Sequence, residues 1–277
     1  MSKKRVLMIG VSTGVGFMAA EKLLQEHNCE VYAAAPDIEP MRSLEALGAT
    51  LIEIDVTSSE SVNNAITQVI EQAGGIDVVH FNAGLNIAGA IEAVPEEMVE
   101  RIYQVNVFGL ARVIRAVTPQ LRKQRAGRFI VTGSVISHFT ARMMGWYSST
   151  KHALYAIMTA FRQEVSEFGI EVVVIEPGQI NTGFDQAAMA RVEAMGHPED
   201  YTHHVDEYIN MNTALLTKAQ DGTTTAAAMV KAITDSTQPK PVIRTTADAV
   251  YVPLIKRLLG VKGFDRMMIK AYRKYRK

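Results

Sequence analysis

The sequence predicts an α/β fold with a single doubly wound parallel sheet and helices on both faces. Over the first 178 residues, short runs rich in β-branched and apolar residues alternate with longer segments of helical periodicity. The runs are almost continuously apolar, which is typical of strands covered on both faces, and every parallel connection requires a crossover helix. The sequence contains no repeat of fixed period that would favour a solenoid.

The individual elements follow from this alternation. The β-rich runs predict strands at 5–10, 30–35, 50–56, 76–84, 127–134 and 170–178. The periodic segments predict helices near 14–27, 40–47, 58–73, 95–124 and 147–168. After residue 178 the pattern loosens, and 183–222 is rich in Ala, Met and His without a strand signal. A chain of 277 residues with 48% apolar content is expected to form one compact domain.

Composition excludes several classes of site. Cys29 is the sole cysteine, which rules out an intrachain disulfide framework and a cysteine-rich metal site. The histidines show no zinc-type spacing, and His203 and His204 are expected on a surface loop. No apolar run approaches the roughly 18 residues that span a bilayer. We therefore expect a cytoplasmic protein without a metal or a nucleic-acid partner.

The balanced charge conceals a basic tail. Of 29 basic and 29 acidic residues, nine basic and one acidic lie in 254–277, which leaves 20 basic and 28 acidic in 1–253. Apolar residues recur in this tail at helical spacing, with Gly260 and Gly263 between them, and predict one basic amphipathic helix or two short ones. The tail either attaches to an anionic membrane surface or covers the end of the sheet or a partner subunit. The stripe comprises Leu254, Leu258, Val261, Phe264, Met268 and Tyr272.

The first strand leads into "GVSTGVG", which places Gly10, Gly14 and Gly16 on the turn into the first helix. Glycines there permit a tight turn and a close approach of backbone N–H groups to a pyrophosphate, while the helix N-terminus favours the anion. The turn predicts a dinucleotide cradle, and an ordinary strand-to-helix turn is the alternative. The spacing is G-x-x-x-G-x-G rather than G-x-G-x-x-G.

Tyr147 and Lys151 are four residues apart in a segment predicted to be helical, so both project from one helix face. The phenol of a free tyrosine has a pKa of about 10, and a neighbouring ammonium lowers that pKa by stabilising the phenolate. The pair is therefore a candidate for proton transfer at neutral pH. Taken alone, the same spacing also occurs on ordinary surface helices.

Seven motifs in order give the sequence a resemblance to the short-chain dehydrogenase/reductase family, and they extend over nearly all of the chain. Ser134 stands thirteen residues before Tyr147, which matches the spacing in the family. The runs "VYAAAPDIEPMRSLEALGATLIEIDVTSSESV" and "KPVIRTTADAVYVPLIKRLLG" are similar to the branch containing hydroxysteroid and retinol dehydrogenases. The motifs are "GVSTGVG" (10–16), "DV" (55–56), "NAG" (82–84), "VN" ending at Asn106, Ser134 in "VTGSV", "YSSTK" (147–151) and "PGQINT" (177–182).

The resemblance implies a Rossmann-like fold and a role for each matching residue. Tyr147 would be the general acid/base, Lys151 would assist it and bind the nicotinamide ribose, Ser134 would hydrogen-bond the substrate oxygen, and Asn106 would hold a water that relays the proton. The implied cofactor-binding residues are Gly10, Ser12, Thr13, Gly14, Val15, Gly16, Asp55, Val56, Asn82, Ala83, Gly84, Tyr147, Lys151, Pro177, Gly178, Ile180 and Thr182.

The implied activity is hydride transfer between a nicotinamide cofactor and a carbonyl or secondary alcohol. The end of the second strand bears on the choice between NAD and NADP, because an acid there binds the ribose 2′-hydroxyl and an arginine accepts a 2′-phosphate. Ala35 occupies the acid position, Pro36 the arginine position, and Asp37 and Arg42 follow. With no acid at Ala35, the sequence favours NADP over NAD.

The substrate is expected to be hydrophobic. In the family, residues corresponding to 135–145 and 183–222 form the pocket and its lid, and here they are apolar and rich in methionine. The resemblance therefore implies a steroid, a retinoid or another lipid-like substrate, with His138 as a possible contact to it. A dinucleotide-binding regulatory protein is one alternative. A related epimerase or dehydratase, which also uses Tyr and Lys four apart, is another, although such chains are usually longer.

The resemblance also implies the organisation of the chain. We expect a dinucleotide-binding catalytic domain over 1–253, with 183–222 as its lid, and a basic C-terminal extension over 254–277. The helices near 95–124 and 147–168 pair across subunits in this family, so a homodimer or homotetramer is expected.

Overall fold

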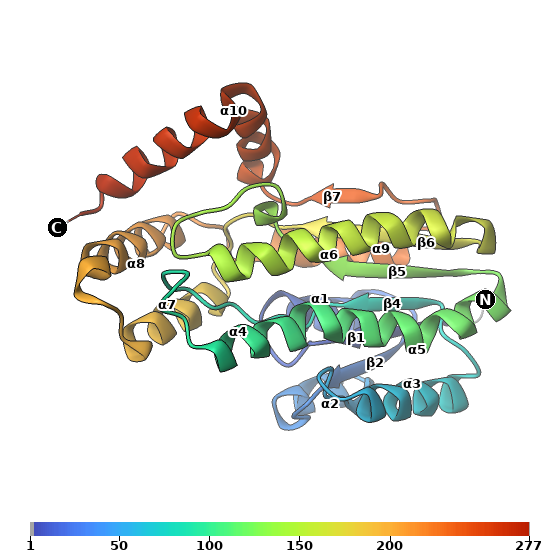
Figure 1. The fold of residues 1–277 in the computed structure, drawn as a ribbon. Helices are drawn as coiled ribbons and strands as arrows, with labels where there is room; N and C mark the ends of the chain where they lie inside the picture. The colour runs from blue at the N-terminus through green and yellow to red at the C-terminus, as the bar shows by residue number, and fades with distance from the viewer. Residues whose placement is uncertain (1–2, 277) are drawn as a thin grey trace.

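Seven parallel strands form one sheet in the order β3-β2-β1-β4-β5-β6-β7 in the computed structural model, which describes residues 3–276 (Figure 1). The order reverses between β1 and β4, as the prediction of a doubly wound sheet requires, and that prediction is confirmed. The strands are β1 (Lys4–Ile9), β2 (Cys29–Ala35), β3 (Thr50–Glu53), β4 (Val78–Phe81), β5 (Gly127–Thr132), β6 (Ile170–Glu176) and β7 (Val242–Arg244).

Helices cover both faces of the sheet, and each face has its own apolar core. On one face lie α3 (Ser59–Ala73), α5 (Gly109–Gln124) and α6 (Gly145–Glu164). On the other lie α1 (Gly14–Glu26), α2 (Arg42–Ala46) and α9 (Thr223–Thr234). The helix predicted near 95–124 consists of α4 (Glu96–Tyr103), the π-helical turn η2 (Gln104–Phe108) and α5.

Two helices, α7 (Phe184–Met195) and α8 (Thr202–Leu216), lie together beside the carboxyl ends of the strands, at the left of Figure 1. They belong to the segment expected to form a lid. The expectation of a loop at His203 and His204 was wrong, because both lie in the first turn of α8 with ring centroids 4.1 Å apart. Pro198 and two acidic residues start the helical turn that precedes α8, which is an ordinary helix-start signal.

The basic tail forms most of α10 (Ala247–Arg273), which is kinked at Gly260 where φ is 62°. The kink divides the apolar stripe. Leu258 and Val261 at the kink are 76% and 70% exposed, whereas Phe264 and Tyr272 beyond it are buried. The Phe264 ring packs against Phe139 at 5.6 Å between centroids. Within residues 3–276, no helix combines the length and the apolar character needed to cross a bilayer.

The second half of α10 is tied to α8 through Glu207. This carboxylate is fully buried and accepts hydrogen bonds from Arg142, in the loop before α6, and from Arg276 at 2.6 Å. The Tyr272 hydroxyl donates to the carbonyl of Arg142 at 3.2 Å, and Asn210 of α8 donates to the carbonyl of Tyr275 at 3.1 Å. The end of the tail therefore forms a wall over the lid region.

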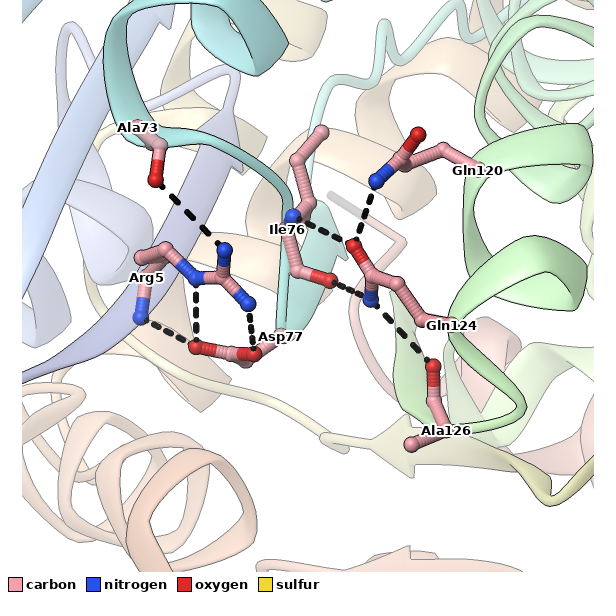
Figure 2. Close-up of polar contacts among 7 residues, drawn as sticks. All are labelled: Arg5, Ala73, Ile76, Asp77, Gln120, Gln124 and Ala126. Carbon is pink, nitrogen blue, oxygen red and sulfur yellow. Dashed lines mark hydrogen bonds and ion pairs between the residues drawn. The ribbon is translucent and has the colours of Figure 1, made fainter. Parts of the chain in front are cut away.

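A separate polar network joins elements at the amino ends of the strands (Figure 2). The Arg5 guanidinium donates to both carboxylate oxygens of Asp77, at 3.0 and 2.6 Å. The Gln124 side chain accepts from the N–H of Ile76 at 3.1 Å and donates to its carbonyl at 2.7 Å. These bonds join β1, the start of β4 and the end of α5 at the edge of the sheet opposite the lid.

Candidate active site

The glycine turn packs tightly against the end of β4. A Cβ at Gly10, where φ is 83°, would lie 2.4 Å from the backbone of Ala83, and a Cβ at Gly16 would lie 2.3 Å from Nδ2 of Asn82. The Asn82 Nδ2 in turn donates to the carbonyl of Gly10 at 2.7 Å. Because a side chain at either glycine would displace Asn82 or Ala83, the turn and the "NAG" segment form one unit.

A cavity of about 350 Å³ lies over the N-terminus of α1. The side chain of the N-cap residue Thr13 makes no capping hydrogen bond, so the first N–H groups of α1 point into this region without a side-chain partner. Such an end, in a turn that excludes side chains, suits a pyrophosphate. The cavity is lined by Ser12, Thr13, Gly14, Phe17, Met18, Pro40, Asn181, Thr182 and Asp221.

Three of the expected cofactor residues lie beside this cavity rather than in its lining. Val15 packs near Gly222, where a Cβ would lie 3.0 Å from its side chain. Asp55 accepts two hydrogen bonds from Thr57, at 2.8 and 2.7 Å, and these bonds hold the pKa of its carboxyl below the ordinary value. Val56 is buried, and its carbonyl accepts from Arg112 at 3.1 Å.

The segment after β6 is fixed by residues that no sequence motif indicated. The N–H of Gly178 donates to Oγ1 of Thr246 at 2.9 Å, and the N–H of Gln179 donates to the Asp248 carboxylate at 2.9 Å. A Cβ at Gly178 would lie 2.0 Å from that carboxylate. The neighbouring Pro177 accepts from the N–H of Val135 at 2.9 Å, which joins this segment to the loop that carries Ser134. Ile180 forms a parallel bridge with Gln220.

Tyr147, Lys151 and Ser134 meet at the start of α6. Tyr147 and Lys151 are only 7% and 4% exposed, and the Lys151 ammonium lies 5.8 Å from the centre of the Tyr147 ring. Ser134 begins the short helix η3 (Val135–Ser137), where its Oγ accepts from the N–H of Ile136 at 3.3 Å. The Ser134 hydroxyl also hydrogen-bonds the Tyr147 phenol. The structure thus brings together three of the four residues expected to be catalytic.

Burial controls the charges of this pair. It raises the pKa of the Tyr147 phenol, and the charge of Asp185 adds to the increase, while the hydrogen bond with Ser134 opposes it. Burial also lowers the pKa of Lys151 to about 8. The expectation that the ammonium would lower the pKa of Tyr147 therefore does not hold for the protein alone, because desolvation is the larger effect. The ammonium donates to the carbonyl of Thr132 at 2.9 Å.

Asn106, the fourth residue, lies in the π-helical turn η2. Its Nδ2 donates to the carbonyl of Leu85 at 2.9 Å and to Oγ1 of Thr150 at 3.0 Å, and its Oδ1 accepts from the N–H of Leu85 at 2.8 Å. Both N–H groups of the amide are therefore used by protein acceptors. The side chain joins the loop after β4 to α6, and a Cβ at Gly84 would lie 3.8 Å from its oxygen and 3.9 Å from the Lys151 ammonium.

Sequence reasoning missed a buried network that links the glycine turn to Lys151. The Thr132 hydroxyl donates to Oδ1 of Asn82 at 2.7 Å, so it accepts from Nε2 of His80 at 3.0 Å and thereby fixes the ring tautomer. Burial lowers the pKa of His80 to about 4, so the ring is neutral at physiological pH. Because Lys151 donates to the carbonyl of the same Thr132, one residue positions both the lysine and the cofactor turn.

His138, considered as a substrate contact, is engaged elsewhere. Its Nε2 lies 2.7 Å from the buried carboxylate of Glu176, and its ring packs edge-on against Tyr155 at 4.8 Å. Its carbonyl accepts from Lys256 of α10 at 2.7 Å. The histidine therefore joins β6, α6 and α10.

A second cavity, of about 700 Å³, lies where the expected pocket segments meet. The Trp146 indole donates to the carbonyl of Ile91 at 3.1 Å and so joins the start of α6 to the loop after β4. The lining combines three segments, 89–92, 140–145 and 201–204, of which the last two fall within the ranges expected to form the pocket and lid. It comprises Gly89, Ala90, Ile91, Glu92, Thr140, Ala141, Arg142, Met143, Gly145, Tyr201 and His204.

Comparison with known proteins agrees with this geometry. Residues 4–193 match the family model described as short chain dehydrogenase. A 3-ketodihydrosphingosine reductase of Bacteroides thetaiotaomicron is 34% identical over 202 residues, which cover 73% of this chain and 72% of the relative. Human 17-beta-hydroxysteroid dehydrogenase type 1 is 28% identical, covering 94% and 82%, and bovine retinol dehydrogenase 8 is 26% identical, covering 91% and 84%.

Solved structures extend the match to the whole fold. A short-chain dehydrogenase from Streptomyces avermitilis is 27% identical and superposes with a TM-score of 0.79 over 99% of both chains. The family match, the relatives and the convergence of Tyr147, Lys151 and Ser134 beside the glycine turn have one explanation. The chain belongs to the short-chain dehydrogenase/reductase family, whose members are NAD(P)-dependent oxidoreductases that act on CH–OH and C=O groups.

Proposed function

We propose that the protein transfers a hydride between a nicotinamide cofactor and a hydrophobic carbonyl compound or secondary alcohol, with Tyr147 as general acid/base. The observation that carries the proposal is the buried cluster of Tyr147, Ser134 and Lys151 next to the glycine turn. The bound dinucleotide would supply or accept the hydride. The protein's own groups position the reactants and move the proton.

The cofactor is held by backbone more than by side chains. The N-terminus of α1, with Gly10, Gly14 and Gly16, accommodates the pyrophosphate, and Ser12, Thr13 and Thr182 line the same cavity. Lys151 and the "NAG" segment adjoin the nicotinamide side, and Pro177, Gly178 and Ile180 close that side from the end of β6. Asp55 and Val56 support the adenine end.

Each catalytic group has a distinct task. In the reductive direction Tyr147 gives its phenolic proton to the carbonyl oxygen, and Ser134 hydrogen-bonds that oxygen as charge develops on it. The raised pKa keeps the phenol protonated at neutral pH, which is the form that reduction requires. Lys151 then stabilises the phenolate with its ammonium. Asn106 positions the loop after β4 against α6 through Leu85 and Thr150.

Arg42 is our candidate for selecting NADP. It follows β2 and is exposed, with ion pairs to Glu39 at 2.9 Å and Glu45 at 3.0 Å. Exposed ion pairs contribute at most about 1 kcal/mol each. A bidentate guanidinium–phosphate contact is a stronger, charge-assisted interaction, so Arg42 gains by exchanging its partners for a 2′-phosphate. Asp37 is used locally, because its carboxylate accepts from the N–H of Glu39 at 3.0 Å.

The size and lining of the second cavity support a bulky apolar substrate. A volume of about 700 Å³ bordered by Ala90, Ile91, Ala141 and Met143 suits a steroid, a retinoid or a long acyl chain. The names of the relatives, which refer to hydroxysteroids, retinol and 3-ketodihydrosphingosine, agree with a lipid-like carbonyl or alcohol.

The exposed part of α10 supports a peripheral contact with membranes. Leu254, Leu258 and Val261 are exposed at and before the kink, and Arg257 and Lys262 are exposed beside them. Exposed apolar side chains flanked by basic ones bind to anionic lipid surfaces. We place this contact in the extension 254–277, attached to the catalytic domain 1–253, although α10 itself begins at Ala247. We further propose a homodimer or homotetramer that pairs through α4–α5 and α6.

The proton-transfer role is tested by following NAD(P)H absorbance with a panel of hydrophobic ketones and alcohols. Tyr147→Phe is expected to lower kcat by about 10² to 10⁴ while cofactor binding persists. Tyr155→Phe, on the same helix, is the matched control and is expected to turn over normally. Full turnover by Tyr147→Phe would contradict the role. Failure of the wild type to turn over any compound, with cofactor still bound, would favour a regulatory dinucleotide-binding protein.

A further inference from the structure

Asp185, in the first turn of α7, lies beside the proposed catalytic tyrosine. The ring of the adjacent Phe184 is 6.0 Å from the ring of Tyr147, and the charge of Asp185 raises the pKa of both Tyr147 and Tyr208. Part of the side chain reaches the surface, but the carboxyl group itself is largely enclosed. Nothing in the reaction proposed above uses this carboxylate.

The carboxylate has no cationic partner. Its hydrogen bonds come from two neutral amides, Nδ2 of Asn86 at 3.1 Å and Nε2 of Gln179 at 3.0 Å. Burial raises its pKa to about 6, and these amides oppose that increase, while no basic group of residues 3–276 contributes to lowering it. At neutral pH most of the carboxyl groups are therefore ionised, although an enclosed charge is stable only when it is paired.

Two further buried oxygens in the same region have no hydrogen-bond donor. Tyr208 is 1% exposed, and its hydroxyl has no partner among the residues that the structure describes. Asn86 is equally buried, and its Oδ1 has none in that same part of the chain. The Asn86 amide is oriented by Asp185, because only its NH₂ group can face a carboxylate, and its oxygen is left available. Unpartnered buried oxygens of this kind indicate a missing donor.

We propose that Asp185, Asn86 and Tyr208 form a binding site for an ammonium group carried by the substrate near its reacting carbonyl. An ammonium has three N–H donors, a positive charge and no acceptor, which complements a carboxylate and two unpartnered oxygens. A hydroxyl would supply one donor and no charge, and a carboxylate would be repelled by Asp185. The substrate class is then an amino ketone, or the corresponding amino alcohol, with an apolar chain.

The bound cation also affects the chemistry, and this part of the inference rests on the proposed function. The negative charge of Asp185 disfavours the phenolate of Tyr147, so an ammonium that neutralises it stabilises the phenolate left after proton donation. Arg191 of the same helix does not take this role, because its guanidinium donates to the carbonyl of Asn86 at 3.0 Å. An ammonium in the substrate is therefore expected to improve both binding and turnover.

Binding is measured first, by calorimetry on the protein saturated with cofactor, with octylamine as the probe and 1-octanol and octanoate as comparisons. We expect octylammonium to bind about 10-fold or more tightly than 1-octanol, and octanoate to bind least well. Asp185→Asn should remove the difference. Asp206→Asn, an exposed acid on α8, makes the same charge change and should preserve it. Equal binding of octylamine and 1-octanol by the wild type would overturn the proposal.

Turnover is then compared for an α-amino long-chain ketone and the same ketone without the amino group. We expect kcat/KM to be about 10- to 100-fold higher for the amino ketone. Asp185→Asn should lose that preference while it still reduces the plain ketone, which also shows that the variant is folded. Tyr208→Phe, which keeps all charges, should lose part of the preference.

The outcomes separate the two proposals. Turnover of both ketones without a preference would refute the ammonium site and leave the proposed function intact. Binding of octylammonium that depends on Asp185, with no ketone reduced, would support the site and refute the proposed function.

Discussion

Replacing Lys151 with methionine is expected to stabilise the protein while it abolishes activity. The lysine is buried, its ammonium hydrogen-bonds the carbonyl of Thr132 at 2.9 Å, and burial lowers its pKa from 10.5 to about 8. That difference corresponds to a cost of roughly 3 kcal/mol for holding the charged group in the folded state. Methionine has a similar length and no charge, and it leaves the carbonyl unpaired at about 1 kcal/mol. The net gain is about 2 kcal/mol, or a rise in Tm of about 4 to 8 °C.

The gain has a characteristic dependence on pH. Below about pH 8 the lysine is protonated in both the folded and the unfolded protein, so the wild type bears the full cost. Between pH 8 and 10.5 the unfolded lysine binds more protons than the folded one, so the wild type becomes more stable as the pH rises and the advantage of the variant disappears. Urea unfolding at pH 7 and at pH 10.5 measures this, with the exposed Lys231→Met as control. A variant no more stable than wild type at pH 7, or a gain unchanged at pH 10.5, would refute the reasoning.

Three other substitutions test separate parts of the structure. Gly16→Ala brings a Cβ to 2.3 Å from Nδ2 of Asn82, so cofactor binding measured by fluorescence titration should weaken at least about tenfold with the fold retained; normal binding would contradict the cradle. Arg42→Ala should raise the KM for NADPH by about tenfold and leave that for NADH unchanged, whereas an equal effect on both would remove Arg42 from cofactor selection. Gln124→Ala removes two hydrogen bonds to Ile76 and should cost about 1 to 3 kcal/mol in urea unfolding without changing kcat, and a large loss of kcat would argue against its separation from the active site.

The regular part of the fold was predictable because strands buried on both faces leave an unbroken apolar run. The strand predicted at 127–134 is observed at Gly127–Thr132, within two residues of its predicted end. Two later elements gave no such signal. β7 has only three residues, Val242–Arg244, too few to show a pattern after two prolines. α9 begins with three consecutive threonines, which are β-branched and disfavour a helix, so its packing against α1 and the sheet decides its conformation.

Residues of the candidate site were predictable where local spacing brings them together. Tyr147 and Lys151 share a face of α6 because they are four apart on a helix. The surroundings of Asp185 were not predictable in this way, since it is 99 residues from Asn86 in the chain and meets it only when the segments after β4 and β6 come to the same edge of the sheet. The tail shows the same limit, because its apolar periodicity could not indicate that Gly260 divides it into an exposed half and a buried half.

The network drawn in Figure 2 has a practical consequence for handling the protein. Arg5, Asp77 and Gln124 lie at the amino ends of the strands, and none of them lines either cavity or belongs to the proposed catalytic cluster. Immobilising the enzyme on a solid support through a residue introduced at this edge would leave the carboxyl edge, with its cofactor cleft and lid, facing the solution. A biosensor or a flow reactor built from the protein should be oriented in that way.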